Sequence, residues 1–310
     1  MWKDVIGNHT LRRSPPHPNK RTNPPTLSRF LYFSHKHAFL LFSSSMEGRR
    51  ALAAQTAEEL QGECALDTVA RTLGGSFVSY TAWPWLVAAL RFGEFGQVLA
   101  ETDDAAVDPD SLLPYTEAMR RFVRGYALAA TGACAAAGEE AKALAALAAN
   151  DTTRNEPLFL VTAGQMFDVA GAALRARLAA GGCLDGVQER GAWSLRGADN
   201  GDSDGSGRAV LEWARAAALV DAFPYMEPPM WPADARACLG QALLDAGRYA
   251  EAERVYEEDL KRWPGNGWSL KGLQVALEGQ GRRAEAWVAE RACAGAWRNA
   301  DVELEGRSCF

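Results

Sequence analysis

The chain has 310 residues, 48% of them hydrophobic, and a formal net charge of −6, which suits one extended array or two compact domains. Residues 1–36 carry an excess of positive charge, so the remainder is strongly acidic. Nucleic-acid binding needs a basic stripe and a membrane span needs a long apolar run, so we expect neither nucleic acid nor a membrane as a partner.

Residues 1–34 are basic and rich in proline, and we expect a disordered leader because they offer little apolar surface to bury. Their arginine and serine content is that of a transit peptide, although the prolines oppose the amphipathic helix that such peptides need. A mis-assigned start of the coding region explains the segment equally well. We expect a cytoplasmic protein, or a plastid protein if the leader is a transit peptide.

Between residues 35 and 300 the apolar residues recur with helical spacing, and only one isoleucine occurs in the whole chain. The predicted fold class is therefore all-α. The expected helices cover residues 35–48, 50–60, 64–73, 83–92, 95–100, 115–130, 134–149, 157–180 and 208–223, and two further pairs follow. An acidic linker is expected at 103–114, a flexible insert rich in Gly, Asp, Asn and Ser at 181–207, and a C-terminal tail at 301–310.

The segment Ala233–Ala300 reads as two helix–turn–helix units with a period of about 34 residues, which is typical of tetratricopeptide repeats. In the first unit, small residues at Gly240 and Ala252 allow the two helices to cross closely, and Tyr256 fills the space between them. Gly247 ends the first helix. We expect an α-solenoid of antiparallel helical hairpins, in which neighbouring pairs bury each other's apolar faces.

Several short sequence motifs follow one another in a consistent order along the chain. They are SMEGR (45–49), LRFGEF (90–95), LPYTEAM (113–119), RGYALAATG (124–132), YMEPPMW (225–231) and EDLKRWPGNGWSL (258–270). In these stretches the chain resembles a family of bacterial-type tetratricopeptide repeat proteins that also occurs in algae and plants. The resemblance implies an α-solenoid with an interaction-type function. It also implies further repeats upstream, without which an apolar N-terminal edge would be exposed.

Catalytic and metal-binding patterns are scarce. All four histidines lie before residue 38, which removes nucleophile–histidine systems and HExxH zinc sites from the rest of the chain. No phosphate-binding glycine loop of the P-loop type occurs. We therefore expect no catalytic residue, no cofactor, no metal and no enzymatic activity. The six cysteines form no C-x-x-C pair, and we expect thiols in a reducing compartment.

The candidate binding residues combine aromatic area and positive charge on the 115–130 helix and at a proline-rich connector. They are Arg120, Arg124, Tyr225, Glu227, Trp231 and Arg236. Tyr225 and Trp231 would supply contact area, and Arg236 would hold a carboxylate or phosphate. The alternative is a rigid connector in which Glu227 pairs with Arg236.

The function we expect is a protein-interaction scaffold that binds a peptide or protein partner in a concave groove. One alternative is a structural element that forms homo-oligomers through its N-terminal edge. Another is an enzyme or small-ligand binder with convergent acids in a pocket between repeats. The C-terminal tryptophans, Trp263, Trp268, Trp287 and Trp297, are read as the core and end cap of the last repeats, or else as an exposed patch for self-association.

Overall fold

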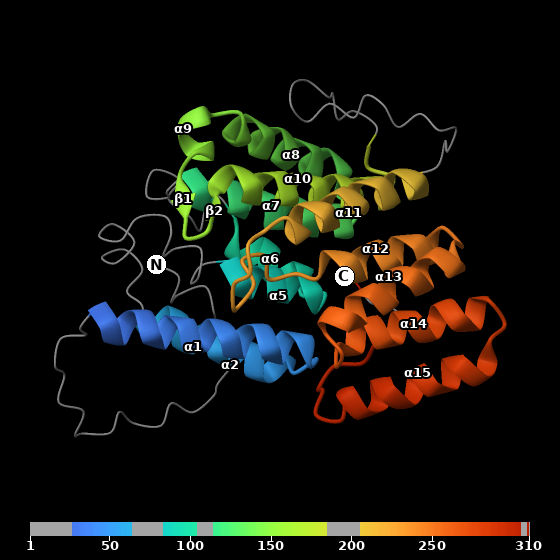
Figure 1. Cartoon of the computed structure of the whole chain (residues 1–310). Helices are drawn as coiled ribbons and strands as arrows, with labels where there is room; N and C mark the ends of the chain where they lie inside the picture. The colour runs from blue at the N-terminus through green and yellow to red at the C-terminus, as the bar shows by residue number, and fades with distance from the viewer. Residues whose placement is uncertain (1–26, 64–82, 104–113, 185–204, 305–308, 310) are drawn as a thin grey trace.

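Helices dominate the computed structural model, which describes residues 27–63, 83–103, 114–184, 205–304 and 309 (Figure 1). The helices in these ranges are α1 (Leu27–Met46), α2 (Arg50–Glu63), α5 (Trp83–Arg91), α6 (Phe95–Glu101), α7 (Pro114–Ala130), α8 (Cys134–Ala148), α9 (Asp151–Arg154), α10 (Ala163–Ala180), α11 (Gly205–Asp221), α12 (Ala235–Asp245), α13 (Tyr249–Arg262), α14 (Gly267–Gly279) and α15 (Arg283–Ala296). The strands β1 (Pro157–Leu158) and β2 (Val161–Thr162) form one antiparallel hairpin. The predicted all-α fold class is confirmed for the described residues, among which no helix has the length and apolarity to cross a membrane.

Two predicted boundaries are wrong. Helix α1 begins at Leu27, so residues 27–34 are helical and do not belong to a disordered leader. Apolar residues and the buried Ser34 recur there at 27, 30, 31 and 34, which is one helix face. The helix expected over 157–180 begins only at Ala163, because Thr162 caps it in a capping box with Gln165 and the preceding residues form the hairpin.

Other predictions fall wholly or partly outside the described residues. These are the leader before residue 27, the helix at 64–73, nearly all of the linker at 103–114 and most of the insert at 181–207. Of the insert, residues 205–207 belong to α11, so its predicted C-terminal boundary is three residues too late.

A recurrent glycine turn joins the helices. Gly247 (φ 69°) follows α12 and Gly281 (φ 76°) follows α14, and both have the left-handed backbone that glycine adopts without strain. In each turn the N–H of the next residue bonds to the carbonyl five residues before it, which satisfies the last helical turn. The same turn ends α1, α5, α7 and α10. The same glycine turn therefore ends the first helix of each pair.

Consecutive helices pack as the pairs α1/α2, α5/α6, α7/α8, α10/α11, α12/α13 and α14/α15. Neighbouring pairs also contact each other: α5 packs on α1 and α7, α10 on α7 and α8, α11 on α12, and α13 on α14 (Figure 1). Alanines make up a large part of the buried positions, so the helices approach closely.

The crossing between α12 and α13 is organised around Tyr256, whose side chain is fully buried. Gly240 of α12 lies against the hydroxyl end of its ring, as the repeat pattern predicts, and Gly272 of α14 lies against the same end. The second glycine was not part of the predicted pattern. Both helices reach the ring because neither carries a side chain at the point of contact.

The first and last helix pairs also meet. The Trp268 Nε1 at the start of α14 donates a hydrogen bond to the carbonyl of Ser45 in α1 at 3.1 Å. The Trp297 ring covers Gly48, where a Cβ atom would stand 2.7 Å from the ring. The two ends of the array are therefore in contact through indole rings, and this part of the N-terminal pair is covered.

The predicted C-terminal tail is docked where the structure describes it. The Asp301 carboxylate accepts the backbone N–H groups of Arg50 and Ala51 at 2.5 and 2.8 Å, and so caps α2. Of the C-terminal tryptophans, Trp287 differs from the other three, because 61% of its surface is exposed.

Four of the six cysteines form disulfides, so the expectation of thiols is wrong for them. Cys134 pairs with Cys183, and Cys238 pairs with Cys309. The partners are 49 and 71 residues apart in sequence, and only the fold brings their Cα atoms to 4.8 and 4.7 Å. The sequence offered no spacing from which these pairs could be read. Cys293 is a buried free thiol, and burial raises its pKa.

Candidate binding pocket

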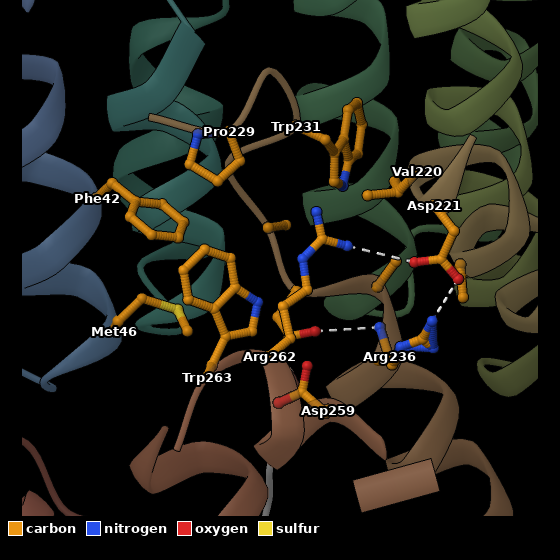
Figure 2. A pocket seen from close by; sticks show the side chains of 14 residues that line it. Phe42, Met46, Val220, Asp221, Pro229, Trp231, Arg236, Asp259, Arg262 and Trp263 are labelled. Carbon is orange, nitrogen blue, oxygen red and sulfur yellow. Dashed lines mark hydrogen bonds and ion pairs between the residues drawn. The ribbon is translucent and has the colours of Figure 1, made fainter. Parts of the chain in front are cut away.

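A connector of residues 222–234 links α11 to α12 and brings Trp231 into the interior. Its prolines restrict the backbone φ angles. Trp231 is only 2% exposed. The indole packs against Phe122 of α7 with ring centroids 5.4 Å apart. Its Nε1–H is buried and has no hydrogen-bond partner. In Figure 2 this nitrogen faces the pocket side of the ring.

The pocket lies where α1, α11, α12, α13 and this connector converge, and it is partly open to solvent (Figure 2). Most of its wall is apolar or aromatic. The wall residues of this kind are Phe42, Met46, Ala217, Val220, Pro229, Trp231, Ala233, Ala235 and Trp263. An apolar wall with a few polar groups is the usual composition of a ligand site.

Two arginines share one aspartate at the pocket. Arg236 of α12 and Arg262 of α13 both form ion pairs with Asp221 at the end of α11, Arg262 at 3.4 Å. The Arg262 guanidinium also lies over the Trp263 ring at 5.7 Å from its centroid. Two positive charges therefore face one negative charge, and each guanidinium has more N–H groups than Asp221 can accept.

The other polar side of the pocket is a pair of carboxyl groups, Asp234 and Asp259. The Asn266 Nδ2 donates to both, at 2.7 and 2.8 Å, and the Ser269 Oγ donates to Asp259 at 2.7 Å. Burial, followed by the neighbouring charge of Asp234, raises the pKa of Asp259 to about 7. The buried Arg91 feels the charges of both aspartates, while its own burial lowers its pKa.

These carboxyl groups also have structural tasks. Asp234 accepts the N–H groups of Arg236 and Ala237 and caps α12. Asn266 caps α14 through Trp268 N. The cluster thus joins the starts of two helices to the middle of the fold, and its hydrogen bonds are those of helix capping and stability.

The predicted pairing of Glu227 with Arg236 is wrong. Glu227 accepts a hydrogen bond from the Tyr225 hydroxyl, whereas Arg236 pairs with Asp221. Tyr225 is 78% exposed, and neither it nor Glu227 lines the pocket. Of the connector residues proposed from sequence, only Trp231 does so.

Arg120 and Arg124 lie on α7 and do not line this pocket, whereas Trp231 and Arg236 of the predicted groove do. Arg120 is 2% exposed and donates to Glu117 and to the Thr102 carbonyl. Arg124 donates to Glu140 and to the Leu99 carbonyl, each at 3.1 Å. Both arginines hold neighbouring helices together.

We therefore expect Arg124→Glu to destabilise the protein without acting on binding directly. The new carboxylate would face the buried Glu140 and leave the Leu99 carbonyl without its donor, at a cost of about 2–4 kcal/mol. Urea unfolding measures the loss, and Arg124→Gln, which brings no like charge, should lose less. A variant with unchanged stability would contradict this assignment.

Sequence reasoning found Trp231 and Arg236 among the pocket residues and missed the others, including Phe42, Met46, Asp221, Asp234, Asp259, Arg262 and Trp263. Arg262 and Trp263 do lie in one of the distinctive stretches, EDLKRWPGNGWSL, which is the one signal that pointed to them. Within the described ranges no group of His, Cys, Asp and Glu is arranged to hold a metal ion.

No family profile, curated protein or solved structure matches the chain. The site combines an aromatic pocket with two arginines, an indole N–H without a hydrogen-bond partner, and the carboxyl groups of Asp234 and Asp259. This arrangement can bind an apolar group beside a hydrogen-bond acceptor.

Proposed function

We propose that the chain is a tetratricopeptide-like solenoid that binds a segment of a protein partner. The paired helices, the glycine turns 34 residues apart at Gly247 and Gly281, and the close crossing of Gly240 on Tyr256 support the repeat architecture. Because the first and last pairs meet, the recognition site in this proposal is the pocket beside α12 and not a long open groove.

One observation carries the binding function: Arg236 and Arg262 share the single carboxylate of Asp221 beside the ring of Trp263. Aromatic and arginine side chains are the residue types that contribute most to binding energy at protein interfaces. The acids Asp234 and Asp259 are occupied by helix capping and buried hydrogen bonds, which favours recognition over acid–base catalysis.

The test is partner recovery from the native source by affinity purification with the full chain. Reversing both charges, Arg236→Glu with Arg262→Glu, should reduce recovery of the specific partner by at least about tenfold, because it removes two charged anchors. Arg283→Glu is the matched control, since Arg283 is exposed on α15 away from the pocket lining.

Circular dichroism should show the same helix content in the three proteins, which separates binding from folding. Equal recovery by wild type and the double variant would overturn the pocket as the recognition site. A loss of recovery in the Arg283 control as well would show that charge reversal anywhere is disruptive, and would also count against the proposal.

A further inference from the structure

We infer that the pocket recognises a carboxylate attached to an apolar group, with Trp231 Nε1, Arg236 and Arg262 binding the oxygens. The inference depends on the proposed binding function and names its ligand chemistry. The apolar group would lie against Phe42, Met46 and Trp263 on the opposite wall.

The buried indole N–H of Trp231 points to a ligand that can accept a hydrogen bond. Trp231 is almost completely buried, and its Nε1–H has no acceptor in the protein. Buried donors are nearly always satisfied, so an unsatisfied one that borders a pocket indicates an acceptor supplied from outside. Figure 2 shows this nitrogen on the side of the ring where Arg262 and Asp221 lie. An acceptor placed there would serve the indole and a guanidinium together.

Charge balance selects the kind of acceptor. Among the three groups joined by ion pairs, Arg236, Arg262 and Asp221, one positive charge is in surplus. Behind them, the buried Arg91 faces Asp234 and Asp259, and burial raises the pKa of Asp259 to about 7. One surplus charge matches a carboxylate, whereas a doubly charged phosphate would leave a net negative charge beside the buried aspartates.

Arg262 controls access to the indole. Its side chain is 48% exposed, and its contact with Asp221 is long at 3.4 Å, whereas the Arg236 side chain is 24% exposed and held more closely. The Nε1 atom of Trp231 is buried, and the Arg262 guanidinium lies on the same side of the indole ring in Figure 2. A carboxylate that draws Arg262 away from Asp221 would reach the indole N–H and keep the guanidinium as a partner.

The test titrates the full chain with N-acetylphenylalanine, its uncharged amide, and inorganic phosphate, followed by calorimetry. The free acid should bind, and the amide should bind at least about tenfold more weakly, because it lacks the charge that the arginines select. Trp231→Phe keeps an aromatic ring but removes the N–H donor together with part of the indole, so it should weaken binding of the acid by about tenfold. Arg283→Ala should change nothing.

Equal binding of acid and amide, tighter binding of phosphate, or an unchanged affinity in Trp231→Phe would each overturn the inference. A peptide ending in phenylalanine, with a free or an amidated C-terminus, identifies the source of the carboxylate. Binding of the free-ended peptide supports the inference together with the proposed function. Binding of the small acid alone supports the ligand chemistry but contradicts a protein partner. Loss of partner recovery in the arginine double variant without any carboxylate binding contradicts the ligand chemistry alone.

Discussion

Gly272→Ala is expected to destabilise the protein by about 2–4 kcal/mol, although alanine is the better helix former. In an exposed helix the same change gains about 0.5–1 kcal/mol. Here a Cβ atom at Gly272 would overlap the ring carbons of Tyr256, which is fully buried and whose hydroxyl end is also in close contact with Gly240. The ring has no free direction in which to move, so overpacking exceeds the gain in helix propensity.

Urea unfolding of two further variants separates this explanation from a general effect of glycine. Gly295→Ala in α15, where no atom lies within 4 Å of the added carbon, should be neutral or slightly stabilising. Tyr256→Leu removes the outer ring atoms, so Gly272→Ala should cost less in that background, with a coupling of about 1 kcal/mol or more. Strictly additive losses would contradict the proposed clash.

Local signals in the sequence located the helices, because their ends depend on nearby residues. Gly247 and Gly281 mark turns that the backbone can form only with a left-handed residue, and the small residue at Gly240 marks a close crossing. The two-residue strands of the hairpin at 157–162 are too short to show any periodicity. The first turns of α1 were missed because the prolines before them suggested that disorder continued to residue 34.

The site was only partly predictable, because its residues come from four helices and a connector. Trp231 and Arg236 were identified from one part of the sequence, whereas Phe42 meets them across more than 180 residues of chain and Arg262 comes from the next helix. Arg120 was misread as a groove residue, since a sequence does not show that the Thr102 carbonyl will accept a hydrogen bond from its guanidinium. The disulfides were missed for the same reason: contact depends on the fold and not on spacing.

The stability of the wild-type protein is expected to fall as the pH rises from about 4 to about 7, through the buried carboxyl of Asp259. Its folded-state pKa is about 7 against an ordinary value of 3.8, so in this window the folded protein holds a proton that the unfolded chain releases. The free energy of unfolding therefore decreases with rising pH, by about 2–4 kcal/mol over the window, and changes little above it.

Asp259→Asn should remove this decrease. The asparagine Oδ1 can accept hydrogen bonds from Asn266 and Ser269, as the carboxyl does. Its amide can donate a hydrogen bond to Asp234 in place of the proton of the Asp259 carboxyl. The variant should match wild type near pH 4–5 and exceed its stability by about 1–3 kcal/mol near pH 8, because it carries no buried charge. The buried Arg91 limits the gain, since it loses one of its two opposite charges.

Thermal or urea unfolding at several pH values measures the difference between the two curves. Asp245→Asn, at the exposed end of α12, is the matched control and should follow the wild-type curve. Parallel curves for wild type and Asp259→Asn would show that Asp259 titrates normally in the folded protein. A variant less stable than wild type near pH 8 would show instead that the charge of Asp259 is needed to hold Arg91. Parallel curves would mean that Asp259 is ionised at neutral pH, and the pocket would then carry one more negative charge than the carboxylate inference assumes.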